Sequence, residues 1–164
     1  MKFILIFQVT LCIFIKNTVL AQDNFDLEKV RNSINTKLIL KRELEEDSVH
    51  YFNSKNKLIC RYIGFIKNGK NKYHFVNSTY IFNILESPTA ESTIILYDSN
   101  LKIYGYYSIS NSDLLPKRIK NNLLLFDIKS EGCNSIIKVN CGLGIPKFIN
   151  LKCKENDIIE FIKK

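Results

Sequence analysis

The sequence is poor in proline and glycine, with three prolines and six glycines among 164 residues, and it contains no tryptophan. It also lacks internal repeats and low-complexity tracts. These shortages exclude a disordered or compositionally biased chain, because such chains are depleted in apolar residues and enriched in turn-forming ones. The length instead suits one folded domain with a hydrophobic core of its own.

Catalytic motifs are missing as well. The chain has only two histidines, His50 and His74, and it lacks the Gly-x-Ser-x-Gly, His-Glu-x-x-His and Walker-type patterns. His74 lies between Tyr73 and Phe75 in a predicted strand, a position typical of a surface or cross-strand residue, and His50 follows an acidic run in a predicted loop. We therefore predict no catalytic residue and no cofactor.

Arginine is scarce beside lysine, although the chain is basic, with a formal net charge of +8. The few arginines do not alternate with aromatic residues as nucleic-acid platforms require, so we do not expect nucleic-acid binding. A positive surplus nevertheless favours anionic partners. The expected partner is an anionic envelope surface, a glycan or another protein, and the oligomeric state stays open.

The first 21 residues are typical of a secretory signal peptide. Lys2 precedes an apolar run from Phe3 to Ile15, and Val19-Leu20-Ala21 offers compact residues to a signal peptidase. A membrane anchor would need about 20 apolar residues, and Lys16 interrupts the run too early. We expect cleavage after Ala21, no membrane span in the single β-rich domain of residues 22–164, and an extracellular or periplasmic location.

Cys12 is the alternative to simple cleavage, since its thiol would carry the lipid of a lipoprotein. The large Leu11 stands before it, where such sites need a small side chain. Removal of Cys12 leaves an even set of four cysteines: Cys60, Cys133, Cys141 and Cys153. An oxidising compartment favours disulfides, and no closely spaced pair suggests a zinc site.

Four cysteines allow three pairings. If all four pair within the chain, every pairing joins Cys60 to the C-terminal region, because the other three lie together there. Such a bond would stabilise the fold by about 4 kcal/mol on the loop-entropy model. We therefore expect two disulfides and no metal site.

One helix and several strands are predicted along the chain. Leu27, Val30, Ile34 and Leu38 recur at spacings typical of a helix, which ends near Thr36 or extends further. A short strand at 38–40 and a solvated acidic run, Glu43 to Asp47, are expected after it. The expected strands are rich in β-branched and aromatic residues: 58–66, 72–76, 93–97, 101–108, 123–128, 136–139, 148–152 and 158–162.

The pattern predicts an α+β fold in which an N-terminal helix packs on a mainly antiparallel, strongly twisted sheet or partly closed β-barrel, stapled by two disulfides. Asn68-Gly69 is expected to turn the first hairpin, and Asp98-Ser99-Asn100 the second. Gly142-Leu143-Gly144 is interpreted as a turn in preference to an anion-binding loop.

Tyrosines give the clearest candidate for a ligand-binding surface. Tyr104 and Tyr106 would share one face of a hairpin by the period of two, opposite Tyr107, and Lys70 would add a basic hairpin tip. Ordinary cross-strand packing of the tyrosines is the competing interpretation. Asn77-Ser78-Thr79 also matches an N-glycosylation sequon, which applies only in a eukaryotic host.

These observations favour an exported, disulfide-stabilised binding or interaction protein of the cell envelope or extracellular space. The first alternative is a secreted hydrolase with a site assembled from dispersed residues. That alternative requires His74 in a concave pocket, within about 3.2 Å of a carboxylate or hydroxyl. The second alternative is a structural envelope protein.

Overall fold

The structure, a computed structural model, describes residues 27–130, 133–151 and 158–164, except for the side chains of Ser130 and Cys133. The chain divides into two compact units, Met1–Ser33 and Ile34–Lys164. The described part of the first unit is the beginning of a helix over residues 27–41, and all features below belong to the second unit. The predicted signal peptide and Cys153 lie outside the described residues.

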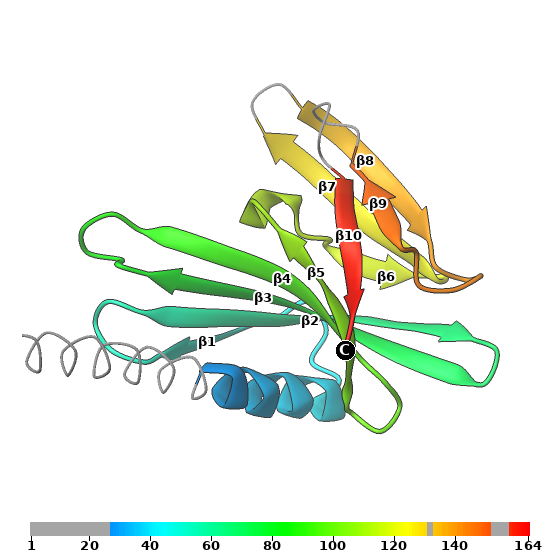
Figure 1. Cartoon of the computed structure of the whole chain (residues 1–164), viewed down its shortest axis with the longest axis horizontal. Coiled ribbons are helices and arrows are strands. Elements are labelled where there is room, and N and C mark those ends of the chain that lie inside the picture. The colour runs from blue at the N-terminus through cyan, green and yellow to red at the C-terminus, as the bar shows by residue number, and fades with distance from the viewer. Residues whose placement is uncertain (1–26, 131–132, 152–157) are drawn as a thin grey trace, which may run out of the picture. The chain divides into compact units, whose positions relative to one another are not determined.

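The described residues form two open antiparallel sheets (Figure 1). The larger sheet has the order β1-β2-β3-β4-β5-β10-β9, and the smaller sheet has the order β6-β7-β8. The elements are β1 (Asp47–Tyr51), β2 (Lys57–Asn68), β3 (Asn71–Phe82), β4 (Thr89–Tyr97), β5 (Ile103–Ile109), the 3-10 helix η1 (Ser112–Leu114), β6 (Arg118–Lys120), β7 (Leu123–Ser130), β8 (Cys133–Asn140), β9 (Phe148–Asn150) and β10 (Ile158–Lys163).

The predicted α+β class with a mainly antiparallel sheet is confirmed, but neither sheet closes into a barrel. Both predicted hairpins are present. Gly69 turns the β2–β3 hairpin with a φ of 58°, and Asp98 Oδ1 accepts the backbone N–H groups of Asn100 and Lys102 at 2.9 Å each in the β4–β5 turn. No helix in the described part of the chain has the length and apolarity of a membrane span.

A hydrophobic core lies between the two sheets. Ile94 and Tyr107 contribute to it from the larger sheet, and Leu124 and Phe126 contribute from β7; all four side chains are fully buried. The Tyr107 hydroxyl donates to the carbonyl of Pro146, which satisfies its polar end inside this core. The smaller sheet therefore covers one face of the larger one.

The helix takes the longer of the two extents that its pattern allows. It continues to residue 41, and the expected short strand at 38–40 does not form. Leu38 and Ile39 are 5% and 4% exposed, so burial of adjacent apolar side chains holds the last turns helical. Asn35 Nδ2 donates to the Tyr97 hydroxyl at 2.9 Å, which links residues 34–41 to β4.

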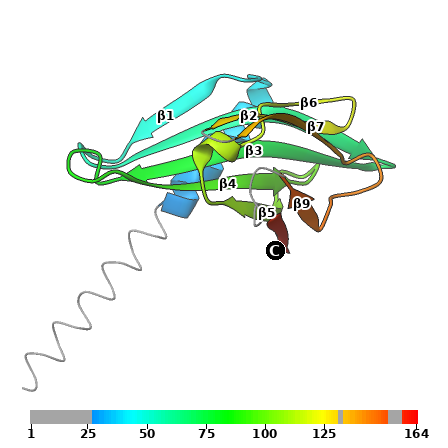
Figure 2. The same cartoon turned by 90° about the horizontal axis from the view of Figure 1, so that it is seen from above.

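Two short strands, β1 and β6, escape sequence prediction. β1 begins at Asp47, inside the acidic run, and includes His50, so the expected solvated helix end and loop are wrong at these residues. β1 lies at the edge of the larger sheet beside β2 (Figure 2). Cross-strand pairing accounts for it, because Asp47 binds Arg61 of β2 through two hydrogen bonds of 2.7 Å.

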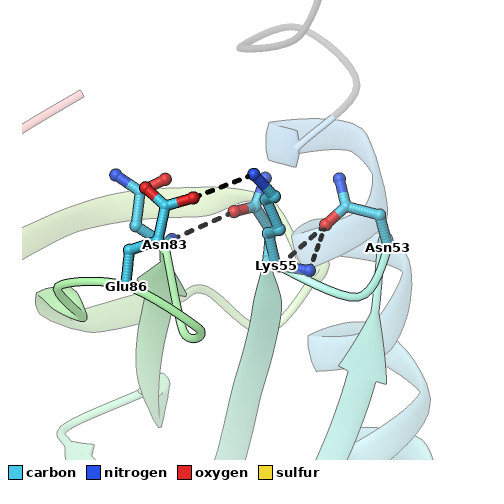
Figure 3. Close-up of polar contacts among 5 residues, drawn as sticks. Asn53, Lys55, Asn83 and Glu86 are labelled. Atoms are coloured by element: carbon cyan, nitrogen blue, oxygen red, sulfur yellow. Dashed lines mark hydrogen bonds and ion pairs between the residues drawn. The ribbon is translucent and has the colours of Figure 1, made fainter.

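The loops at one end of β1 to β4 are tied together by polar contacts (Figure 3). Asn53 Oδ1 accepts the backbone N–H groups of Lys55 and Asn56 at 2.8 Å each, which closes the β1–β2 turn. Lys55 Nζ lies 3.2 Å from Glu86 Oε1 in the β3–β4 loop, and Asn56 Oδ1 accepts from the Asn83 N–H at 3.4 Å. These contacts join the β1–β2 turn to the β3–β4 loop.

The disulfide staple is not supported. No disulfide is found among the described residues, and Cys141 bears a thiol that donates to the carbonyl of Val139 at 3.7 Å in the inter-sheet core. Cys60 lies on the other face of the larger sheet, with its Sγ 3.9 Å from Ser78 Oγ. A Cys60–Cys141 bond would therefore have to pass through the sheet.

Candidate functional site

The predicted tyrosine surface is divided between the two faces of the larger sheet. In the pairing of β4 with β5, consecutive residues of β4 lie opposite Gly105 and Ile103, which leaves Tyr104 as the extra residue of a β-bulge. The bulge interrupts the period of two. Tyr104 and Tyr106 therefore do not share a face, contrary to the sequence expectation.

Tyr104 packs on the side of the inter-sheet core. Its ring centroid lies 4.7 Å from that of Tyr73 and 5.8 Å from that of Phe161, and Lys163 Nζ lies 5.4 Å from the ring centroid. Tyr106 lies opposite Ile95 and Ile162 in its strand pairs. Both tyrosines are half-buried, and the structure does not join them into one binding surface.

Lys70 is exposed at the tip of the β2–β3 hairpin, as predicted for a solvated turn. It lines neither of the two cavities described here. Lys67 and Lys72 of the same hairpin do line the larger cavity. The β2–β3 hairpin therefore contributes cations to this cavity from its paired strands and not from its tip.

The larger cavity has a volume of about 630 Å³ and lies beside the part of β2 that β1 does not cover. The β1–β2 pairing ends at Arg61. Beyond it, Leu44 forms a parallel bridge with Tyr62, and the Glu45 N–H donates to the Tyr62 carbonyl at 3.0 Å. These contacts hold the segment that follows the helix against β2 and place Arg42 in the cavity wall.

The aromatic side of the cavity depends on a second β-bulge, at Gly64. Tyr62 lies opposite Val76 and Phe65 lies opposite His74, so the bulge between them brings Tyr62 and Phe65 to the same face. Gly64 has a φ of 119°, a backbone angle that residues with a side chain rarely adopt. A Cβ placed on it would lie 3.3 Å from the Cβ of Ile119. Glycine is therefore required where the cavity wall bends.

Another part of the cavity wall comes from the β6–β7 turn. Asn121 and Asn122 both have positive φ angles, 52° and 58°, which asparagine tolerates better than most residues. Asn122 Oδ1 accepts the backbone N–H of Lys67 at 2.9 Å, and this contact fixes the turn against β2. The cavity thus has walls from both sheets.

The charged side chains among the described lining residues of this cavity are all cations. Arg42, Lys67 and Lys72 line it, no carboxylate is among the described lining residues, and no ion pair of the described residues involves these three cations. Partial burial lowers the pKa of Lys72, and the charges of Arg42 and Lys67 lower it further. Lys72 Nζ lies 4.2 Å from the Phe65 ring centroid, a cation–π contact. The three cations are close enough to repel each other.

His74 and Tyr62 form a hydrogen-bonded pair in the same wall. His74 Nδ1 lies 2.8 Å from the Tyr62 hydroxyl, and His74 is only 7% exposed. Burial, followed by the charges of Lys72 and Arg42, lowers the pKa of His74 to about 4, and burial raises the pKa of Tyr62 to about 12. Both side chains are therefore neutral at pH 7.

The smaller cavity has a volume of about 160 Å³, and Asp47, Arg61 and Asn77 are among its lining residues. Arg61 and Asp47 form the two-bond pair described above, and this hydrogen bonding holds the pKa of Asp47 below its usual value. Asn77 is 7% exposed, and its Nδ2 donates to the Pro116 carbonyl at 2.7 Å. The sequon asparagine is therefore buried in the fold, so a glycan on Asn77 is incompatible with this structure.

No group of three or more histidine, cysteine or carboxylate side chains within the described ranges could hold a metal ion. No protein-family model matches the chain, and neither a curated protein nor a solved structure matches it.

Sequence reasoning missed most of this cavity, including Arg42, Tyr62, Phe65 and Lys72. These residues are scattered over the chain, and Tyr62 and Phe65 fall on opposite faces in a regular strand. Gly64 is the signal that could have located the site, because an isolated glycine inside a strand pattern often marks a bulge.

Proposed function

We propose that this chain is a binding protein whose ligand is a small organic anion with an apolar body, and that the cavity lined by Arg42, Lys67 and Lys72 is its binding site. The observation that carries the proposal is the convergence of three unpaired cations on an aromatic wall without a carboxylate among the described lining residues. An anion would relieve the repulsion between the cations.

The shape and lining of the cavity support a small ligand. A volume of about 630 Å³ lies within the range of cavities that hold metabolite-sized or drug-sized molecules, about 300 to 1,000 Å³. Tyr62, Phe65 and Ile119 supply apolar area, and the cations supply orientation. The ligand would place its anionic group near Lys72 and its apolar body against the aromatic rings.

The test uses anilinonaphthalene sulfonate, a fluorescent dye with one sulfonate and an apolar ring system. We expect Lys72→Gln and Arg42→Gln each to weaken its binding by roughly 5- to 20-fold, since a charge-assisted contact contributes about 1.5 kcal/mol. Lys70→Gln removes an equal charge from the exposed hairpin tip and should change the dissociation constant less than about twofold. Added salt should weaken binding to the wild type.

An equal loss of dye affinity in the Lys70 and Lys72 variants would contradict the proposal, because the net charge of the protein would then explain binding. The uncharged analogue N-phenylnaphthylamine provides the second comparison. Binding of the sulfonate no tighter than that of the uncharged dye would also contradict it.

We also propose export, which rests on the signal-like segment from Met1 to Ala21. Peptide mass spectrometry of the protein recovered from the medium or periplasm should show Gln22, or the pyroglutamate that it forms, as the first residue. In an oxidising compartment a disulfide among cysteines other than Cys141 is expected. Intact mass after alkylation, with and without reduction, counts such bonds, and four free thiols would exclude them.

A secreted hydrolase is the alternative that one observation favours. His74 lines a cavity and lies 2.8 Å from a hydroxyl, which meets the geometric requirement for a general base. A histidine with a pKa of about 4 is a weak base, however, and Tyr62 holds its proton to about pH 12. Hydrolysis of a panel of nitrophenyl esters by the wild type, abolished in His74→Gln, would establish the alternative over simple binding.

A further inference from the structure

We propose that His74 is a specificity-determining residue of the cavity, which donates a hydrogen bond from its Nε2–H to an oxygen of the bound anion while Tyr62 holds the ring in place. This inference rests on the proposed function and names what the site selects. The ligand must carry an unprotonated oxygen, as a carboxylate, sulfonate or phosphate does, beside its apolar body.

The placement of His74 supports this role. The residue lines the cavity although it is 7% exposed, and its Nδ1 is engaged at 2.8 Å by the Tyr62 hydroxyl. No other hydrogen bond of the ring is found among the described residues. Nε2 is therefore available to a ligand in the cavity.

The direction of the hydrogen bond to Tyr62 fixes the tautomer of His74, because Nδ1 is the acceptor when the hydroxyl donates and the donor when the hydroxyl accepts. We assign the hydroxyl as the donor. A phenol that keeps its proton can donate it, and His74 Nδ1 is the only acceptor found for the Tyr62 hydroxyl among the described residues. Nδ1 is then the acceptor, so the single proton of the neutral ring resides on Nε2. A neutral donor is thereby presented to the cavity.

The surroundings of His74 make the donor selective for an anion. Lys72 of β3 and Arg42 of the segment after the helix both act electrostatically on the ring, and the rings of Tyr62 and Phe65 pack beside it at centroid distances of 5.7 and 5.9 Å. In the proposed complex, the anionic oxygen of the ligand lies near these two cations and faces His74 from the cavity. A ligand without such an oxygen would leave the buried Nε2–H of His74 without a hydrogen-bond partner. Such a ligand would therefore bind more weakly.

The experiment compares the sulfonate dye with N-phenylnaphthylamine in four proteins: the wild type, His74→Leu, His74→Gln and Tyr62→Phe. We expect His74→Leu to weaken sulfonate binding by about tenfold and to change uncharged-dye binding less than about twofold. His74→Gln should recover most of the affinity, because its amide N–H can occupy the place of Nε2–H. Tyr62→Phe, which frees the tautomer, should give an intermediate loss.

Nitrogen NMR of the wild type tests the tautomer without any substitution. We expect a protonated Nε2 and an unprotonated Nδ1 at pH 7, and a shift of the Nε2–H signal on addition of the sulfonate dye. Protonation of Nδ1 instead, or an equal loss of both dyes in His74→Leu, would overturn the inference. If the protein then still binds the sulfonate dye selectively and Lys72→Gln weakens this binding, the proposed function stands without the role of His74. If Lys72→Gln does not weaken it, both the proposed function and the role of His74 are wrong.

Discussion

Gly64 is the residue on which the shape of the cavity wall depends. Its φ of 119° and the Ile119 Cβ atom 3.3 Å from an added Cβ both disfavour a side chain. We expect Gly64→Ala to lower the free energy of unfolding by about 2 kcal/mol, as a strained backbone does, and to weaken dye binding. Urea unfolding followed by circular dichroism measures the change.

Gly69 offers the matched control. It has a φ of 58° at the hairpin turn, and an added Cβ would meet no atom within 4 Å. Gly69→Ala should therefore cost about 1 kcal/mol, from backbone conformation alone, and leave dye binding unchanged. Equal destabilisation by both substitutions would show that packing against Ile119 and the bulge geometry contribute nothing at Gly64.

His74 makes the stability of the protein depend on pH. Its folded-state pKa of about 4 lies below the value of 6.5 expected in the unfolded chain, so unfolding takes up a proton between these pH values. The free energy of unfolding should therefore be unaffected by His74 above pH 6.5 and fall by about 3 kcal/mol as the pH drops to 4. Urea titrations at successive pH values measure this slope.

His74→Leu should remove most of that slope, which separates His74 from other titrating groups. Asp47 acts in a more acidic range, because Arg61 holds its pKa below 3.8 and its stabilisation is lost only as the carboxylate becomes protonated there. An unchanged slope between pH 6.5 and 4 in His74→Leu would show that His74 can be protonated without loss of stability.

Side-chain direction is the property that sequence reasoning predicts least well here. The strands containing Tyr62, Phe65, Tyr104 and Tyr106 were predictable from their β-branched and aromatic residues. A bulge changes the faces of the following residues without changing composition, so the period of two failed at Tyr104 and at Gly64. The larger cavity was missed for the same reason.

At the scale of elements, the Asn53 side chain makes two of the hydrogen bonds that close the β1–β2 turn (Figure 3). Asn53 Oδ1 accepts two backbone N–H groups, from Lys55 and Asn56. We expect Asn53→Ala to lower the free energy of unfolding by about 1 kcal/mol, whereas Asn53→Asp, which keeps the accepting oxygen, should stay within about 0.5 kcal/mol of the wild type. Hydrogen exchange should show β1 opening more often in the alanine variant, and equal exchange in the two variants would contradict this.

Element boundaries show where local pattern gives way to tertiary contacts. β2 to β5 were predictable because their apolar runs are bounded by clear turns. The helix end at residue 41 was not, because burial of Leu38 and Ile39 decides it. Nor was β1, whose acidic start forms a strand through the Asp47–Arg61 pair across to β2. Local propensity was too weak to indicate either feature.

At the scale of the molecule, fold class was predictable but strand partners were not. Short strands without intervening helices indicated an antiparallel protein, as observed. A simple meander does not describe it, since β10 pairs with β5 while β6, β7 and β8 form a second sheet. Pairings of this sequence separation depend on the shared core, which no local pattern reveals.

The inter-sheet core should make the two sheets unfold together. Phe126 of β7 is fully buried there, and Phe126→Ala should lower the free energy of unfolding by about 3 to 4 kcal/mol. Ile136→Ala, in the neighbouring strand β8 at a position 71% exposed, should cost less than about 0.5 kcal/mol.

Because one core joins both sheets, amide hydrogen exchange should show the same loss of protection in β3 and β7 of Phe126→Ala. Loss confined to β7 and β8 would mean that the smaller sheet unfolds independently, and a cavity with walls from both sheets would then open without unfolding the larger one.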